Sequence, residues 1–421
     1  MKTASVLEAN TLCPGCSHEL AVVKGYVTWC DNCDWNLQAP EPYRPISIFE
    51  RVYLKAGNTS NKQILDSLLH KEDLRTDKFS YLKLITLLAA SLVHIASLGF
   101  FIFGCYFIQS DFPNILFIVL GVSLVALAWF TFPKPGRLRQ KPLPRESFPH
   151  LYKLADELSD VLHAEKIHGI IIDEQYNASF SQVGWKQRKI LRLGLPLLTV
   201  INRDETVALF SHEIAHGVNG DLLRGIWFGS AVRTLSWWYD ITQPDRSGKS
   251  SIFTIIVDLL LYVLSKIIYL FLYILGHLNW RESQRAEYLA DQLAATAAGK
   301  HAVQSLLDKL HLDKSFEFSI LKAMNTQRDG HFFEDLAEQF AEIPAKELER
   351  IKRIARLEQA RLDATHPPTR FRVNYIDSLA DATPGYTLDD ETYASIQREI
   401  SKLHRSVEKL IMDRYKRVYK Q

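Results

Sequence analysis

The sequence predicts a mainly α-helical membrane protein that also contains a small β-sheet and a cysteine-rich N-terminal module. Two long apolar runs, at 84–108 and 112–132, indicate membrane helices. Four cysteines stand as two closely spaced pairs within the first 40 residues. The last third of the chain carries apolar residues at helical spacing among many charges, which is typical of amphipathic helices. Its 421 residues are enough for two or three domains.

The cysteine pairs are Cys13-Pro-Gly-Cys16 and Cys30-Asp-Asn-Cys33, with 13 residues between them. Four thiolates at this spacing are typical of a zinc ribbon, and a segment with few apolar residues needs such a site for its folding energy. Two disulfides or a redox pair are the alternative, which a cytoplasmic location disfavours. We therefore expect a structural zinc ion held by all four cysteines in a ribbon at 1–40.

A transmembrane hairpin is expected at 81–132, after a proline-rich linker and polar connector at 41–80. The first apolar run contains no Asp, Glu, Lys or Arg, and His94 and Cys105 are among its few ionisable groups; the second run has none. Each run is long enough to cross a bilayer, and the turn between them is short. We interpret Cys105 as an inert apolar side chain. A buried pair of core helices is the alternative, which these lengths disfavour.

Flanking charges predict the orientation of the hairpin. Basic residues stand before the first run and after the second, and none lies in the turn between them: Lys78, Lys83, Lys134, Arg137, Arg139, Lys141 and Arg145. This asymmetry places both ends in the cytoplasm. The first 78 residues are polar and mixed, so we expect no signal peptide. The net charge of +2 gives no reason to expect a nucleic-acid partner. We expect a multi-pass protein of the inner or cell membrane, with the ribbon and the following domain facing the cytoplasm.

A small sheet is expected after the hairpin. An amphipathic helix at 148–165 precedes two apolar, β-branched stretches at 167–172 and 189–200, and the segment 177–185 lies between them. These segments are interpreted as strands of one small sheet.

The next helix is expected to begin at Asn202, which can cap it together with Glu205. Gly217 and Gly220 can end it. An apolar stripe at helical spacing predicts the buried face, formed by Val207, Phe210, Ile214 and Val218. Another face of the helix is then left to present polar ligands.

That face carries the sequence H-E-x-x-H. On a helix, His212 and His216 lie one above the other, close enough to share one metal ion, and Glu213 lies beside them. Two neutral imidazoles can hold Zn²⁺ while a neighbouring carboxylate takes a proton from water, so the arrangement suits zinc-dependent hydrolysis. A chance match is the alternative, although a bland histidine pair would not need Glu213.

Two further apolar stretches, at 222–239 and 252–277, contain charged residues in their interiors. Charge in lipid is costly, so a second hairpin, a re-entrant pair and a bundle lying against the membrane all remain open, and we favour the hairpin. From Asn279 onward the chain is highly charged and helical in pattern. A third metal ligand is needed, and Glu287 is a candidate, with Asp291 on the same helical face. A solvated surface with ordinary charge pairing explains the two residues equally well.

Four motifs in order resemble the membrane zinc endopeptidases of the HtpX type, relatives of the CAAX prenyl protease. They are H-E-x-x-H at 212–216, E-x-x-A-D at 287–291, "NASF" at 177–180 and "THPPTRFR" at 365–372. The chain departs from the family pattern by the extra Ser179 in "NASF" and by the N-terminal ribbon.

The resemblance implies a zincin-like metallopeptidase domain at 133–421 with an apolar, membrane-associated insertion at 222–278. It implies a catalytic zinc ion held by His212, His216 and Glu287, with Glu213 as general base and Asp291 orienting a ligand histidine. It also implies that His366 and Arg372 donate to the tetrahedral oxyanion or to the substrate carbonyl, and that Asn177 and Ala178 lie on an edge strand that pairs with an extended substrate. For His366, a helix-capping role before Pro-Pro is the alternative.

The expected activity is therefore that of a membrane-bound zinc endopeptidase. The resemblance and the topology indicate misfolded or damaged membrane proteins as its polypeptide substrates. A processing protease of narrow specificity is one alternative, and a non-catalytic membrane adaptor is another, although an adaptor has no need of all four metal-site residues. The closed four-thiolate site predicts that the ribbon contacts a protein partner or regulates access.

Overall fold

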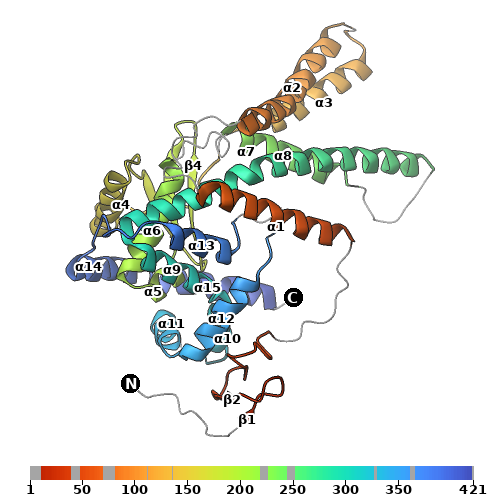
Figure 1. Cartoon of the computed structure of the whole chain (residues 1–421). Coiled ribbons are helices and arrows are strands. Elements are labelled where there is room, and N and C mark those ends of the chain that lie inside the picture. Colours follow the sequence, from red (N-terminus) through yellow and green to blue (C-terminus); the bar gives the residue numbers. More distant parts are fainter. Residues whose placement is uncertain are drawn as a thin grey trace.

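The structure, a computed structural model, describes residues 11–38, 48–69, 81–110, 112–134, 136–218, 226–243, 252–326, 330–360 and 366–419. Figure 1 shows a helical body from which two apolar parts, the α2–α3 pair and the first half of α8, project. The expected linker at 40–45 lies outside the described residues. The prediction of a mainly helical membrane protein with a small sheet and an N-terminal cysteine cluster is confirmed.

The N-terminal module consists of a short antiparallel pair, β1 (Thr11–Leu12) and β2 (Glu19–Leu20), around the four cysteines. Helix α1 (Ile48–Leu69) follows. Its Ile64, Leu65 and Leu68 side chains are buried in the main hydrophobic core. The described part of the expected connector, residues 48–69, is thus an integral helix of the folded body.

The apolar hairpin consists of α2 (Tyr81–Ser110) and α3 (Ile115–Thr131). The two helices meet closely at glycines, because a Cβ on Gly121 would lie 2.6 Å from the Gly104 carbonyl oxygen. Among the described residues, α2 and α8 are long and apolar enough to cross a membrane, and α3 is a shorter apolar helix of 17 residues. The expected helical pair at 81–132 is therefore present.

A three-stranded sheet follows the hairpin, in the order β3-β5-β4. Strand β3 (Gly169–Asp173) runs parallel to β5 (Arg188–Gly194), and β4 (Ala178–Val183) pairs antiparallel with β5. The expectation of strand from 195 to 200 is wrong, because this stretch forms helix α5 (Leu195–Val200). Pro196 lacks the N–H that a sheet ladder needs, and proline favours the first turn of a helix.

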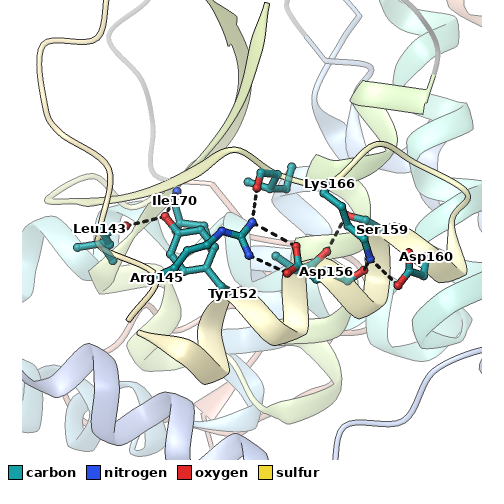
Figure 2. Close-up of polar contacts among 10 residues, drawn as sticks. Leu143, Arg145, Tyr152, Asp156, Ser159, Asp160, Lys166 and Ile170 are labelled. Atoms are coloured by element: carbon teal, nitrogen blue, oxygen red, sulfur yellow. Dashed lines mark hydrogen bonds and ion pairs between the residues drawn. The ribbon is translucent and has the colours of Figure 1, made fainter. Parts of the chain in front are cut away.

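The segment between the hairpin and helix α4 (Pro149–Val161) is held against α4 and the sheet by polar contacts. Helix α4 itself ends at Val161, before the expected residue 165. Figure 2 shows the Arg145 guanidinium donating to both carboxylate oxygens of Asp156, at 2.7 and 3.3 Å, and lying 4.3 Å from the centre of the Tyr152 ring. The Tyr152 hydroxyl donates to the Leu143 carbonyl oxygen and accepts from the Ile170 N–H. These contacts join the segment before α4 to α4 and β3.

Helix α6 (Arg203–Val218) begins with the expected capping box. The Glu205 N–H donates to Asn202 Oδ1 at 2.9 Å, and the Asn202 N–H donates to Glu205 Oε2 at 2.6 Å. The expectation of one-sided burial is wrong, because every residue from 205 to 216 is buried. Helices α4, α8 and α9 and strands β4 and β5 all pack against α6. Gly217 does not end the helix but lets the Phe180 ring approach it, and Gly220 lies outside the described residues.

Helix α8 (Ile252–Ala298) is continuous for 47 residues and joins the second apolar stretch to the E-x-x-A-D motif. Its first half exposes apolar side chains, and its second half is buried in the main core. Helix α7 (Ile226–Ile241) has 16 residues, which is short for a span, and packs against α2 and α8. Helices α7 and α8 thus form a packed pair of unequal length, with residues 222–225 outside the described part.

The C-terminal part is helical and completes the core around α4, α6 and the second half of α8. Its helices are α9 (Lys300–Leu310), α10 (Asp313–Thr326), α11 (Phe332–Ala341), α12 (Ala345–Leu357), α13 (Thr369–Ser378), α14 (Asp390–Ser401) and α15 (His404–Tyr419).

Candidate metal centre

Helices α6 and α8 bring three metal-binding side chains together in the core of the molecule. His212 and His216 come from α6 and Glu287 comes from α8, and one donor atom of each lies within 4.8 Å of the others. All three side chains are buried. The sequence separates Glu287 from the histidines by an apolar insertion, and the packing of α6 against α8 removes that separation.

The distances between the donor atoms fit one zinc ion. Glu287 Oε2 lies 3.6 Å from His212 Nε2, and Glu287 Oε1 lies 3.6 Å from His216 Nε2. Both distances are too long for hydrogen bonds. Two ligands about 2.1 Å from a tetrahedral zinc ion lie roughly 3.4 Å apart. Two imidazoles and one carboxylate are also a donor set that zinc accepts, so the residues present fit the ion.

Asp291 orients one of the ligand histidines. Its Oδ1 lies 3.1 Å from His212 Nδ1, which leaves Nε2 of that ring facing Glu287. Asp291 in turn accepts two hydrogen bonds from Arg372, at 2.8 and 2.6 Å. Burial alone would raise the pKa of Asp291, but the Arg372 guanidinium outweighs it and holds that pKa below its usual range. A charged carboxylate is thereby kept against the histidine.

The charges of the other site residues are set by the same contacts. Burial alone would lower the pKa of His212, but the carboxylates of Asp291 and Glu287 raise it to about 9. Burial would raise the pKa of Glu287, whereas its contacts with His212 and His366 hold it well below the usual range. A metal ion on the histidine nitrogens would replace the protons held there.

The remaining expected site residues lie around this centre. Glu213 is buried on α6 between the two histidines in sequence. His366 Nδ1 lies 2.7 Å from Glu287 Oε2, and its ring is 55% exposed. Pro368, and not His366, is the capping residue of α13. Arg372 is buried, and its guanidinium donates to Asp291. Arg372 is therefore linked to the ligand histidine His212 indirectly, through the Asp291 carboxylate.

Strand β4 lies beside the metal centre. Ala178 is its first residue, and Asn177 precedes it, with its carbonyl oxygen accepting from the Gly194 N–H at 2.8 Å. In the part of the chain that the structure describes, β4 pairs with β5 on one side alone and so forms an edge of the sheet. Its Phe180 ring packs against Gly217, one residue after His216. This edge of the sheet therefore adjoins the helix that carries the histidines.

The N-terminal cysteines form a second candidate metal centre. The four sulfur atoms lie within 4.8 Å of one another, with 3.6 Å between Cys13 and Cys33 and between Cys16 and Cys30. Thiolates about 2.3 Å from a tetrahedral zinc ion lie roughly 3.8 Å apart, whereas a disulfide needs about 2.05 Å. All four cysteines are free thiols, which contradicts the disulfide alternative and fits a shared ion.

The sequence between 150 and 380 matches the family model for peptidase family M48. The chain belongs to this family. The matched residues include both histidines of the H-E-x-x-H motif, the three acidic site residues Glu213, Glu287 and Asp291, and the His366 to Arg372 segment, whereas the ribbon, α1 and the α2–α3 hairpin lie before them. The sequence-based resemblance is thus confirmed, and the protein is a membrane-associated metalloprotease.

Curated relatives of this M48 peptidase carry the same family resemblance. A protease HtpX homologue of Pyrobaculum aerophilum is 26% identical over 248 residues, which are 55% of this chain and 68% of the relative. One of Pyrococcus furiosus is 24% identical over 266 residues, covering 61% and 79%. Protease HtpX of Pasteurella multocida is 30% identical over 183 residues, covering 41% and 59%. No solved structure matches this chain.

Two parts of the site were missed by the sequence analysis. The pairing of Arg372 with Asp291 joins residues 81 positions apart, and no local pattern predicts it. Glu205 was expected only as a helix cap, but it also accepts from Ser305 and Lys309, both at 2.6 Å, and so fixes the start of α6 to α9. Ser305 and Lys309 lie four residues apart on one helical face, which is the only signal that the sequence offers.

Proposed function

We propose that this M48 peptidase is a zinc-dependent endopeptidase that hydrolyses peptide bonds of misfolded or damaged membrane proteins. The convergence of His212, His216 and Glu287 at separations suited to one zinc ion carries the proposal. The apolar helices α2 and α8 and the names of the relatives support the membrane context. The assignment to quality control rests on the family resemblance.

Each site residue is given a role in the reaction. His212, His216 and Glu287 would hold zinc, which, when bound, lowers the pKa of water towards about 7 and polarises the scissile carbonyl. Glu213 accepts the proton of the attacking water and passes it to the departing amine. Asp291 holds the His212 ring in position.

The exposed His366 ring donates to the substrate carbonyl, and Arg372 acts through Asp291. We assign these different roles because the two side chains differ in exposure. His366 faces solvent beside Glu287, whereas the Arg372 guanidinium is buried and already donates two hydrogen bonds to Asp291. Asn177 and Ala178 begin the edge at which an extended substrate adds as a strand. Main-chain hydrogen bonds then supply affinity, and sequence preference stays loose.

The domain organisation is proposed to follow the same plan. A zinc-binding ribbon at 1–40 and a connector at 41–80 precede the hairpin at 81–132, and the peptidase domain at 133–421 contains the insertion at 222–278. The positive flanks of the hairpin support a multi-pass protein whose ribbon and catalytic domain face the cytoplasm.

The test compares detergent-purified, zinc-loaded wild type with Glu213→Gln on an unfolded test protein, and also records self-cleavage. We expect the variant to keep its zinc and to cleave about 10²–10⁴-fold more slowly, because the general base is lost. Glu165→Gln, a change of an exposed carboxylate, is the matched control and should cleave normally.

The zinc content separates the other outcomes. If wild type and variant both hold the catalytic zinc and neither cleaves, broad quality control is wrong and a processing protease of narrow specificity takes its place. If the wild type binds only the ribbon zinc, the catalytic assignment itself is wrong.

A further inference from the structure

The N-terminal module docks on α12 of the peptidase body. Figure 1 places the β1–β2 module beside α10 and α12. The Arg353 guanidinium donates to the Asp31 carbonyl oxygen at 2.7 Å and to Asp34 Oδ1 at 2.8 Å. It also lies 5.1 Å from the centre of the Trp29 ring, and Trp29 is fully buried. These acceptors belong to the second cysteine knuckle and its flank, so their geometry depends on the thiolate site.

A second arginine of α12 completes this docking surface. Arg350 Nη1 donates to the Leu37 carbonyl oxygen at 2.9 Å. Glutamates of the same helix hold both arginine heads: Glu347 accepts twice from Arg350, both at 2.7 Å, and Glu349 accepts once from Arg353 at 2.9 Å. The docking surface is thus pre-oriented for backbone carbonyls of the ribbon.

Helix α1 extends the contact towards the metal centre. Asn58 Oδ1 accepts from the Ala360 N–H at 3.0 Å and from Arg370 Nη2 at 2.7 Å. Ala360 comes shortly after α12, and Arg370 lies in the first turn of α13. Figure 1 shows α1 beside α13. The Asn58 amide oxygen therefore binds one residue before His366 in the sequence, Ala360, and one residue after it, Arg370.

His366 depends on this backbone for its position. Its Nδ1 contacts Glu287 at 2.7 Å, but its ring is 55% exposed and gains little from packing. A half-exposed ring can adopt several rotamers, and its backbone can also shift. Contacts from other parts of the chain must therefore fix the start of α13. Asn58 supplies one such contact, and His311, 2.5 Å from Thr369 Oγ1, supplies another.

We propose that the N-terminal module and helix α1 together form an intramolecular clamp, in which docking of the ribbon on α12 and the contact of the Asn58 amide with the start of α13 hold His366 against Glu287. The first partner of the ribbon is then this chain's own α12. Asn58 is a positioning residue, since it touches neither the metal ligands nor the substrate edge. The catalytic part of the inference rests on the proposed function.

The experiment compares Asn58→Leu, which removes the acceptor at similar volume, with Asn58→Asp, which keeps it. In detergent-purified, zinc-loaded full-length protein, hydrogen exchange of α12 and α13 is followed by mass spectrometry, and kcat and KM are measured on the unfolded test protein. We expect faster exchange in α13 and kcat about ten-fold lower with KM unchanged for Asn58→Leu. The Asn58→Asp variant should stay within about two-fold of wild type in both readouts.

A second variant keeps the test decisive if Asn58→Leu fails to fold. Arg353→Met removes the contact with the ribbon from a partly exposed site on α12, and it should speed exchange in the ribbon and α13 and lower kcat in the same direction. Unchanged exchange in α13 in the variants that fold overturns the clamp, whatever the activity. Faster exchange with unchanged kcat overturns the positioning of His366. An inactive wild type tells against the proposed function, while exchange still judges the clamp.

Discussion

The buried pair of Arg372 and Asp291 should make the peptidase domain sensitive to the loss of either charge. Arg372 donates two hydrogen bonds to Asp291, and the two residues are 7% and 0% exposed. The change Arg372→Met keeps most of the side-chain length but leaves the Asp291 carboxylate buried, with His212 as its remaining charged or hydrogen-bonded partner among the described residues. That carboxylate is 0% exposed in the structure, so solvent contributes little to its hydration.

The size of the effect follows from the burial. Breaking a buried ion pair on one side costs about 3–5 kcal/mol, because the remaining charge is uncompensated. In a domain of this size, each kcal/mol lowers the melting temperature by about 2–4 °C, so we expect a loss of about 6–20 °C. The double variant Asp291→Leu, Arg372→Met leaves no charge behind and should regain most of that loss. It should still bind the catalytic zinc about 10–100-fold more weakly, because His212 has lost its acceptor.

The assay is thermal unfolding in detergent at one fixed scan rate, together with zinc titration of the apoprotein. Arg414→Met is the matched control, since Arg414 lies 3.1 Å from Glu174 in a solvent-exposed pair and should cost about 0–1 kcal/mol. If Arg372→Met and Arg414→Met lower the melting temperature equally, the buried pair does not carry the assigned energy. If the double variant binds zinc like wild type, Asp291 does not position His212.

Three further changes test the packing that builds the site. Gly194→Ala should abolish folding, because the added Cβ would lie 1.6 Å from the Gln175 carbonyl oxygen. Gly276→Ala is the control, since a Cβ added there has room. The yield of monodisperse protein in detergent measures the effect of each change. Gly121→Leu should separate α2 from α3 and lower the melting temperature. Gly99→Leu should not, because a Cβ added there would meet no atom within 4 Å beyond the backbone of its own helix. Glu205→Ala removes the acceptor of Asn202 and Lys309 and should cost about 2–4 kcal/mol in denaturant unfolding.

Features coded by neighbouring residues were predictable from the sequence. The capping box at Asn202 and Glu205 and the helical placement of both histidines need only contacts within one helix, and both are present. Pro196 also marks the boundary between β5 and α5, because proline disfavours a sheet ladder and favours the first turn of a helix. This boundary is therefore coded locally too, although the apolar run across it predicts a single strand.

Features that depend on several elements were beyond the sequence analysis. The apolar stripe on α6 marks the face that packs first, but it says nothing of α4, α8, α9 and the strands that also close around the helix. Full burial then places the two histidines in a low-dielectric surrounding, in which their contacts with Glu287 and Asp291 are stronger than at a surface. The docking of the ribbon on α12 is of the same kind, because it joins residues more than 300 positions apart.

The continuity of α8 links the membrane segment to the metal centre. Trp280 of α8 is buried, and Glu282 of α8 lies 3.6 Å from Lys83 at the start of the apolar run of α2. The apolar segments of the two helices therefore end side by side, at this pair of charges. Glu287 follows Glu282 by five residues, which is about 7.5 Å along a helix. A helix without a break transmits any tilt or shift of its apolar half to the ligand at the other end. An apolar half of α8 placed in a bilayer would hold the metal centre close to the membrane surface, where substrate segments would have to reach it.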